Sequence, residues 1–392
     1  MELQISPQLK KLVDDAREWG ETEARPAGLE ADRSGSPLPV GHAYFQRFID
    51  RGRGRRELMA AAEPAPEGRI TQMVVLGEES AYWDRGMGVA SPGAGFPSGM
   101  VNAAGTPEQK ERFLGPFAHH TTPHWASFAL TEPGGGSDTA AFRTHARKTD
   151  KGYVLNGAKC FIGNASRADW VLVQTTLDPT KGRAAQRAFF VERSTPGFTG
   201  VKIEKKMGLR SYESVSFILE DCEVPADHLL GGERSEPKMG AAGSGSYGAT
   251  MGALNATRVG VAASALGVAR AAYDEARRFA RESGAIKSPR IRDKLELMLR
   301  KIRGARLMTL QAAWMADNRR SNILESSMAK IITAEVAQET AALGMEIVGL
   351  EAGAGHNLVE KLFRDAKALN IVEGTGQIQR VIMGRSLVGL PR

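Results

Sequence analysis

Apolar residues repeat with a helical period through the first third of the chain. The helical stretches are 8–24, 44–62 and 69–84. We expect the first helix to end before Pro26 and a polar loop to occupy residues 28–41. Thr106-Pro107-Glu108-Gln109 marks a further helix start, because Thr can cap the helix, Pro suits its first turn and Gln completes a capping box. Residues 1–122 are therefore expected to form an N-terminal helical domain.

From about residue 125 the pattern changes to short apolar runs separated by Gly, Pro, Asn and Asp. The expected strands are 125–130, 153–155, 159–162, 170–175, 188–191, 201–203 and 215–219. Six or seven short strands of this kind indicate an antiparallel sandwich or barrel. We assign residues 123–232 to this central β-domain.

Long helical patterns return after a Gly/Ser-rich stretch at 231–248, which reads as a loop or hinge. They cover 256–282, 291–318, 325–349 and a final pair around Glu373. The first of them has small residues at helical spacing, which allow helices to pack closely, as in a four-helix bundle. We expect residues 233–392 to form this C-terminal bundle. The fold class is then α+β, with an antiparallel β-sandwich or barrel between two helical domains.

Charge and composition narrow the function classes. The chain has 392 residues and a net charge of +7, with basic clusters at 51–56 and 287–303. Acidic residues are interspersed and no aromatic residues interleave with the Arg run, so we expect no nucleic-acid partner. A polyanionic small substrate such as a coenzyme A ester suits the charge better. No apolar run approaches the roughly 20 residues of a membrane span, and no signal peptide is visible, so we expect a cytoplasmic protein without a membrane partner.

Two motifs are weaker than they first look. Residues 243–248 match the spacing of a dinucleotide fingerprint, but no strand precedes them, and we expect a flexible loop. His119, His120 and His124 suggest a metal, but Pro123 interrupts the helix that would align them and no acidic partner is near in the sequence. Cys160 and Cys222 have no metal or disulfide spacing. We therefore predict no metal site.

Three stretches carry residues suited to catalysis, at 128–139, 156–164 and 364–380. In the first, a strand ends at Thr131 and a Gly-rich turn exposes backbone N–H groups and two hydroxyls, which can bind a carbonyl-rich or anionic ligand. In the second, an Asn-Gly turn leads into a strand and a second exposed loop. In the third, a charged helical run reaches Glu373, followed at once by Gly-Thr-Gly. By local sequence alone Glu373 reads as a surface acid at a helix end, and the alternative is a positioned base.

Together these stretches resemble the acyl-CoA dehydrogenase family. Leu-Thr-Glu-Pro-Gly-Gly-Gly-Ser-Asp at 130–138 resembles the first family signature, and Asn-Gly-Ala-Lys-Cys-Phe-Ile-Gly-Asn at 156–164 resembles the second flavin-contact segment. Residues 364–380 resemble the catalytic segment, and 205–210 and Val224-Pro225 also match. The resemblance covers nearly the whole chain and is weakest before Gly105.

The resemblance implies a cofactor, a substrate and a base. It places FAD against Phe128, Leu130, Thr131, Ser137, Phe161, Ile162, Gly163, Glu346, Gly349, Leu350, Thr375 and Gln377. It places the acyl-CoA against Ser137, Asn255, Arg258 and Gly374. Glu373 would remove the α proton while the β hydrogen leaves as hydride to flavin N5, giving a trans-2-enoyl-CoA. The electrons would pass to an electron-transfer flavoprotein, and the family assembly is a homotetramer, with a dimer or a mixed tetramer as alternatives.

Several positions depart from the family pattern. Gly163 stands where Thr or Ser is frequent, Phe161 where Trp is common, and Val372 where an aromatic residue often precedes the base. The usual Arg-x-x-Phe-Gly loop motif is missing from 281–289, and Glu346 stands in place of Gln. Some relatives carry the base on the first bundle helix, but the matching residue here is Thr257. The alternatives are a flavin oxidase, monooxygenase or desulfinase on the same fold, or a non-catalytic subunit that binds FAD poorly.

Overall fold

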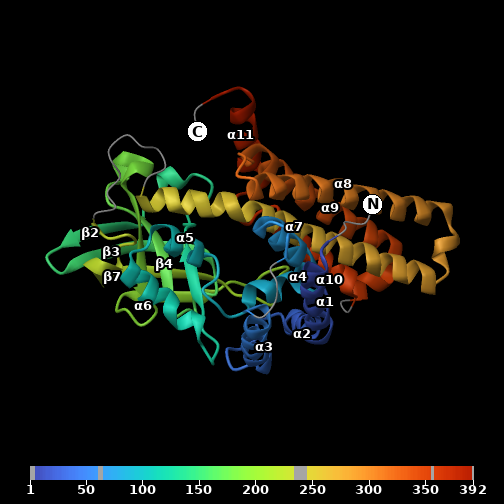
Figure 1. Ribbon diagram of the computed structural model, residues 1–392, viewed down its shortest axis with the longest axis horizontal. Helices are drawn as coiled ribbons and strands as arrows, with labels where there is room; N and C mark the ends of the chain where they lie inside the picture. The colour runs from blue at the N-terminus through green and yellow to red at the C-terminus, as the bar shows by residue number, and fades with distance from the viewer. Residues whose placement is uncertain (1–4, 61–64, 234–244, 355–356, 391–392) are drawn as a thin grey trace.

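The computed structural model describes residues 5–60, 65–233, 245–354 and 357–390. Helices fill the first part of the chain (Figure 1). They are α1 (Pro7–Trp19), α2 (Arg25–Ser34), α3 (Ala43–Ala60), α4 (Arg69–Ala90), α5 (Pro97–Ala104) and α6 (Pro107–Ala118). The predicted capping box of α6 is present, with N–H groups of Thr106 and Gln109 each bonded to the other's side-chain oxygen at 3.2 Å.

The predicted loop at 28–41 is wrong over its first half. A π-helical turn, η1 (Gly20–Ala24), joins α1 to α2, and α2 continues to Ser34. Pro26 lies in the first turn of α2, where a missing N–H costs no helical hydrogen bond. The helix ends at Gly35, whose φ of 70° suits a left-handed C-cap.

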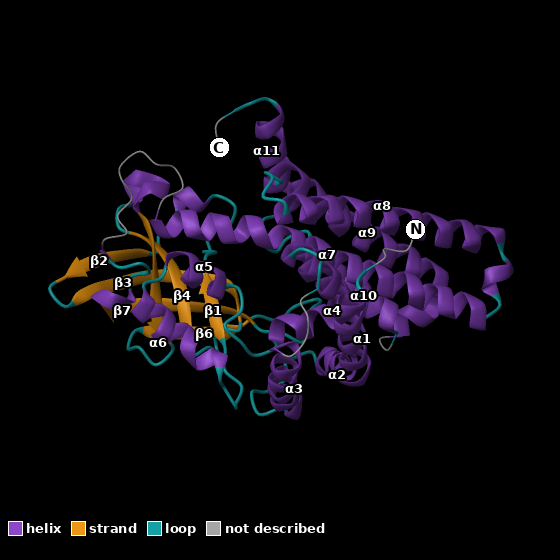
Figure 2. Cartoon of the chain, in the orientation of Figure 1, coloured by secondary structure: helices purple, strands orange, loops and turns teal. Residues whose placement is uncertain are grey.

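Seven strands form one hydrogen-bonded sheet, coloured orange in Figure 2. They are β1 (Ala126–Ala129), β2 (His145–Thr149), β3 (Gly152–Gly163), β4 (Trp170–Thr176), β5 (Gln186–Glu192), β6 (Phe198–Ile203) and β7 (Ser214–Pro225). Their order is β1-β4-β2-β3-β7-β6, and β5 also pairs with β4. Most pairings are antiparallel as predicted, whereas β4 runs parallel to β1 and to the start of β2.

One long strand replaces two short predicted ones. The expected turn at Asn156-Gly157 lies inside β3, at a shift of register against β7. Gly157 has φ 147°, and an added Cβ would lie 2.5 Å from the Thr144 hydroxyl oxygen. Glycine here therefore allows a bulge and a close approach of chain segments instead of a turn. Strand β2 was not predicted, because its alternating residues are mostly polar and exposed.

Five helices complete the chain. They are α7 (Gly245–Glu282), α8 (Pro289–Asp317), α9 (Ile323–Val348), α10 (Leu358–Leu369) and α11 (Gly376–Leu387). The predicted loop at 243–248 is wrong from Gly245 onward, because α7 begins there, and residues 243–244 lie outside the described part of the chain. A helix of 38 residues can include glycines at about 1 kcal/mol each, since helix formation is cooperative.

Helix α7 contacts both the β-domain and the C-terminal helical bundle. It starts beside the sheet and runs into the bundle, where it packs on α8, α9 and α10 (Figure 1). It also packs on α4, and the approach is so close that a Cβ on Gly267 would lie 2.3 Å from the carbonyl oxygen of Glu78. The α+β organisation predicted from the sequence is confirmed. A search of the described helices finds none that is both long and apolar enough to cross a bilayer.

Candidate active site

The turn between α10 and α11 places Glu373 in an unusual backbone conformation. The N–H of Gly376 bonds to Asn370 O at 2.9 Å, and Thr375 caps α11 through its side chain. Glu373 has φ 54° and Gly374 has φ 95°. A left-handed conformation costs a non-glycine residue about 1 kcal/mol or more, so the surrounding contacts must hold Glu373 in place. The turn therefore directs one particular carboxylate.

Side chains from three helices act on the Glu373 carboxylate. Its Oε2 is buried and lacks a hydrogen-bond partner among the described residues, although the residue as a whole is partly exposed. Burial raises the pKa of Glu373 above its usual value. A hydrogen bond from Thr257 on α7 opposes this rise, as do the positive charges of Arg85 on α4 and Lys330 on α9. A carboxylate with a raised pKa in a buried site has the properties of a general base.

Lys330 reaches the same turn from α9. Its side chain is fully buried, and Nζ donates to the Gly374 carbonyl oxygen at 2.6 Å. Burial lowers the pKa of Lys330 to about 8. The negative charge of Glu373 raises this pKa, and the positive charge of Arg258 lowers it. Lys330, Arg85 and the contact made by Thr257 were not among the residues predicted from the sequence. The available signal for Lys330 was a single cation inside the apolar run Ala329-Lys330-Ile331-Ile332.

Arg258, one of the residues expected at the acyl-CoA, also lies here. It is buried on α7, and its Nε lacks a partner in the described part of the chain. Burial lowers the pKa of its guanidinium. A buried N–H donor without a partner is costly unless a ligand completes it, so the Nε–H of Arg258 suits an anionic or carbonyl-bearing group. Asn255 belongs to α7, but its side chain lies outside the described residues.

The two predicted flavin loops of the β-domain lie side by side. The N–H of Cys160 donates to Thr131 O at 3.0 Å, and the Ser127 hydroxyl donates to Gly163 O at 2.7 Å. Buried Lys159 joins the loops further, with Nζ 2.9 Å from Leu130 O and 2.8 Å from Glu132 Oε1. The structure therefore brings together the ends of β1 and β3, as the motifs require.

Phe161 is the most exposed aromatic side chain of this region. Its φ is 60° and 68% of its surface is accessible, at a register shift in β3. Ile162 points the other way and packs in the core at 3% exposure, so only its backbone can meet a ligand. Phe128 lies half-buried with its ring 5.2 Å from that of Phe96. An exposed aromatic ring held in a strained conformation is a suitable stacking surface for a planar group.

The remaining expected flavin residues divide into two groups. Leu130 and Thr131 are half-buried beside these loops, Ser137 is exposed on the Gly-rich turn, and Thr375 and Gln377 begin α11. Glu346 lies near the end of α9, about 24 Å along the helix from Lys330 at roughly 1.5 Å per residue, and Gly349 and Leu350 follow in the short helical turn after α9. Glu346 pairs with Lys294, and Leu350 is 97% exposed. The chain by itself does not bring this second group to Glu373.

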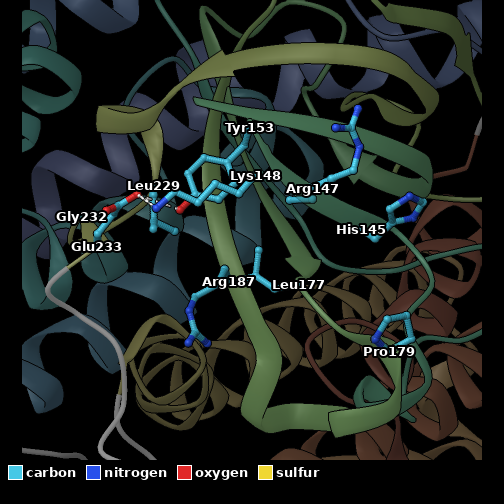
Figure 3. Close-up of a pocket in the computed structure, with 11 residues that line it drawn as sticks. His145, Arg147, Lys148, Tyr153, Leu177, Pro179, Arg187, Leu229, Gly232 and Glu233 are labelled. Carbon is cyan, nitrogen blue, oxygen red and sulfur yellow. Dashed lines mark hydrogen bonds and ion pairs between the residues drawn. The ribbon is translucent and has the colours of Figure 1, made fainter. Parts of the chain in front are cut away.

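A separate pocket of about 490 Å³ lies on the β-domain (Figure 3). Its lining includes Arg147, Lys148 and Arg187, and Lys148 forms an ion pair with Glu233 at 2.6 Å. None of the residues expected at the flavin or the acyl-CoA lines this pocket. It is therefore distinct from the site around Glu373.

The histidine cluster has an acidic neighbour after all. His124 Nδ1 lies 2.8 Å from Asp169 Oδ2, so the fold supplies an acidic partner that is not near in the sequence. The contact is invisible in the sequence because the two residues are 45 positions apart. Within the described ranges no three His, Cys, Asp or Glu side chains are grouped to hold a metal ion.

The chain is similar to known proteins over most of its length. The family models "Acyl-CoA dehydrogenase, middle domain" and "Acyl-CoA dehydrogenase, C-terminal domain" match residues 127–222 and 244–388. Cyclohex-1-ene-1-carbonyl-CoA dehydrogenase of Syntrophus aciditrophicus is 36% identical over 397 positions, covering 98% of this chain and 91% of the relative.

Two solved structures share the whole fold. Butyryl-CoA dehydrogenase of Megasphaera elsdenii has a TM-score of 0.86 at 29% identity, covering 99% of this chain and all of that chain. A chain in a structure reported under the heading of the electron transferring flavoprotein of Acidaminococcus fermentans has a TM-score of 0.85 at 28% identity, with coverage of 99% and 100%.

Proposed function

The chain belongs to the acyl-CoA dehydrogenase family, and we propose that it introduces an α,β double bond into an acyl-CoA thioester with Glu373 as the base. The family assignment makes the protein an oxidoreductase acting on acyl-CoA. The observation that carries the specific role is the buried, unpartnered Oε2 of Glu373 on a left-handed turn. An oxygen that no protein donor satisfies is available to take a proton from a substrate.

The backbone beside Glu373 supplies the second requirement. In the described part of the chain, neither the N–H of Glu373 nor that of Gly374 donates a hydrogen bond to an acceptor. An N–H directed at the thioester carbonyl stabilises the charge that develops as the α proton leaves. Base and donor then belong to one rigid turn, so proton removal and charge stabilisation act on the same Cα–C=O unit. This alignment is what makes a weakly acidic C–H removable.

The residues of the β-domain fit a bound flavin. The exposed Phe161 ring offers a stacking surface, and the adjoining Leu130 and Thr131 are accessible at the end of β1. When bound, FAD would accept the hydride from the β carbon. Leu130, Thr131, Phe161 and Gly163 would hold it against the thioester, and Thr375 and Gln377 would approach it from α11. Glu346, Gly349 and Leu350 would contact the FAD of a neighbouring copy in the homotetramer that the family resemblance implies, or in a dimer or a mixed tetramer.

Val372, next to Glu373, is the position that bears on the size of the acyl group. Val372 is partly buried and smaller than an aromatic residue, which leaves room there for a branched or cyclic group. The relative from Syntrophus acts on a cyclic acyl-CoA by its name, and the Megasphaera enzyme on butyryl-CoA. We therefore propose short or cyclic acyl groups as the first substrates to test, with an electron-transfer flavoprotein as the acceptor.

The test is anaerobic flavin reduction. Purified protein is mixed with butyryl-CoA and with cyclohexanecarbonyl-CoA, which both carry an α and a β hydrogen. Bleaching of the flavin band and formation of the enoyl-CoA product are followed. The flavin of the wild type should be bleached by one of the two classes of acyl-CoA, short-chain or cyclic. The Glu373→Gln variant should bind flavin, but neither substrate should bleach it. Wild-type rates in Glu373→Gln would disprove the role of the base. Oxygen uptake without enoyl-CoA would favour an oxidase, monooxygenase or desulfinase, and protein that stays colourless after adding FAD would favour a non-catalytic subunit.

A further inference from the structure

Lys330 is a buried cation placed where its charge has no ordinary structural partner. Lys159, Lys330 and Lys361 are the buried lysines of the described chain. Lys159 pairs with Glu132 at 2.8 Å, and Lys361 pairs with both Asp84 and Asp365 at 2.7 and 2.6 Å. Lys330 alone among these three has no carboxylate within 4.0 Å in the described part of the chain, and its hydrogen bond goes to a backbone carbonyl.

That carbonyl belongs to the residue directly after the base. Nζ of Lys330 lies 2.6 Å from Gly374 O, and Gln379 Nε2 lies 3.4 Å from the same oxygen. The Gly374 peptide is thereby held on one side while Gly374 adopts a φ of 95°. The orientation of this peptide determines the direction of the Glu373 side chain, because the two residues share one turn. A neutral hydrogen-bond donor such as an amide could hold the carbonyl equally well, so the choice of a cation needs a further reason.

We propose that Lys330 is a positioning residue of the active site, holding the turn that carries Glu373 and stabilising the carboxylate form of that base. This inference rests on the proposed role of Glu373. A buried lysine charge is costly unless a nearby negative charge offsets it, and Glu373 is the carboxylate that faces it. Conversely, burial disfavours the ionised Glu373 that proton removal requires, and a fixed positive charge opposes that effect.

The groups around the base come from three helices. Arg85 faces Glu373 from α4, Thr257 from α7 and Lys330 from α9, and Arg258 on α7 lies near Lys330. Arg85 is partly exposed, so solvent screens its charge, whereas Lys330 is fully buried. Arg85 nevertheless favours the carboxylate form of Glu373 more strongly than Lys330 does, and Lys330 is the cation that also bonds the turn carrying Glu373. Lys330 can act on Glu373 in two ways, through its hydrogen bond to the turn and through its charge.

The experiment compares the pKa of the Glu373 carboxyl in Lys330→Met and in the wild type. Loss of the charge should raise the pKa of Glu373, and the acidic limb of kcat/KM for flavin reduction should move up by about one pH unit, which is about a tenfold loss on that limb. KM should change little, because the Lys330 side chain is fully buried and directed at the Gly374 carbonyl. Lys330→Arg, which keeps the charge, should keep the wild-type limb. Lys301→Met, which removes an exposed lysine paired with Glu339, is the matched control and should shift nothing.

A second readout separates this inference from the proposed function. The carboxyl band of Glu373 is titrated by infrared difference spectroscopy, assigned through Glu373→Gln, without any turnover. If the wild type fails to reduce its flavin, the proposed function fails while this titration still decides the role of Lys330. An unchanged Glu373 titration and an unchanged acidic limb in folded Lys330→Met would overturn the inference. If that variant does not fold, Lys330→Gln, which keeps a donor but no charge, is measured in its place by the same criteria.

Discussion

The Thr257 side chain on α7 hydrogen-bonds the carboxylate of Glu373, which lies 116 positions further along the chain. The bond favours the ionised form of Glu373 against the effect of burial. It also places a bundle helix in direct contact with the turn between α10 and α11. By the family resemblance, the base can stand at the position of Glu373 or at that of Thr257. These two positions are adjacent in this fold, and the Thr257 hydroxyl stabilises the Glu373 carboxylate.

Replacing Thr257 by Val keeps the shape of the side chain and removes the hydroxyl. Because the Glu373 carboxylate loses a hydrogen bond, its pKa should rise and the acidic limb of flavin reduction should move to higher pH. A hydrogen bond to a charged group contributes about 1.5–3 kcal/mol, so a loss of about tenfold on that limb is expected. Thr257→Ser keeps the hydroxyl and should match the wild type. A shift of equal size in both variants would contradict this reading.

The raised pKa of Glu373 predicts how stability depends on pH. A carboxyl whose pKa is higher in the folded than in the unfolded state binds more protons when folded, so its contribution to stability falls as pH rises between the two values. Above the folded pKa, the buried charge destabilises the protein. Glu373→Gln should therefore raise the melting temperature at pH 7 and have little effect near pH 4. Melting curves of both proteins at the two pH values give the answer, and equal differences at both would refute the linkage.

Gly374→Ala should damage catalysis more than folding. An added Cβ would lie 2.6 Å from Gln379 Nε2, and the φ of 95° disfavours any side chain. The turn must shift, and a displacement of about 1 Å at a catalytic group can cost about 10²-fold in rate. Stopped-flow flavin reduction should show this loss with a normal flavin content.

Gly384→Ala on α11 is the matched control for that change. No heavy atom lies within 4 Å of the added Cβ, so the variant should reduce its flavin normally. It should gain about 0.5–1 kcal/mol of stability, because alanine favours a helix. A large activity loss in Gly384→Ala would show that α11 responds to any substitution, and the argument for Gly374 would fail.

Gly163→Ser should tighten FAD binding. The nearest atom to an added Cβ is 3.9 Å away, in Tyr212, so the side chain fits without strain. The family resemblance places a flavin-contacting hydroxyl at this position, and one added hydrogen bond of about 1 kcal/mol corresponds to roughly fivefold in Kd. Titration of the apoprotein with FAD measures the change. Gly157→Ser in the same strand is the control, because an added side chain has no space there and should destabilise the fold. Equal FAD affinity in the wild type and in Gly163→Ser would rule out the proposed contact.

Lys361 anchors a buried ionic cluster next to the catalytic segment. It pairs with Asp84 at the kink of α4 and with Asp365 on α10, and Asp365 accepts the N–H of Leu209 at 2.5 Å. Lys361→Met leaves two buried carboxyl groups without their cation and should cost about 3–5 kcal/mol in urea denaturation. Lys301→Met breaks a solvent-exposed pair and should cost less than about 1 kcal/mol. Similar losses in the two variants would mean that the cluster has no special role.

Much of the site was readable because its residues are neighbours in the chain. The Glu373-Gly374 turn, the Gly-rich turn before Ser137 and the exposed Phe161-Ile162-Gly163 segment are each continuous in sequence. Their conformations depend on local preferences, such as glycine at a positive φ and Thr at a helix start. The same reasoning identified the Thr106 capping box. It failed at Gly157, where glycine serves a bulge, because a turn and a bulge use the same residue.

The sequence by itself determined the order of helical and strand regions, the α+β class and the identity of Glu373 as the acid to examine. Periodicity and local backbone preference carry that information, since they act between residues a few positions apart. Only the tertiary structure decided that Lys330, Thr257 and Arg85 meet at Glu373, and that β4 pairs in parallel with β1. These contacts join segments far apart in the chain, and they form because helices α4, α7 and α9 bury their faces together. The charge around the proposed base is therefore a property of the packing, while the position of Glu373 on its turn is encoded in the local sequence.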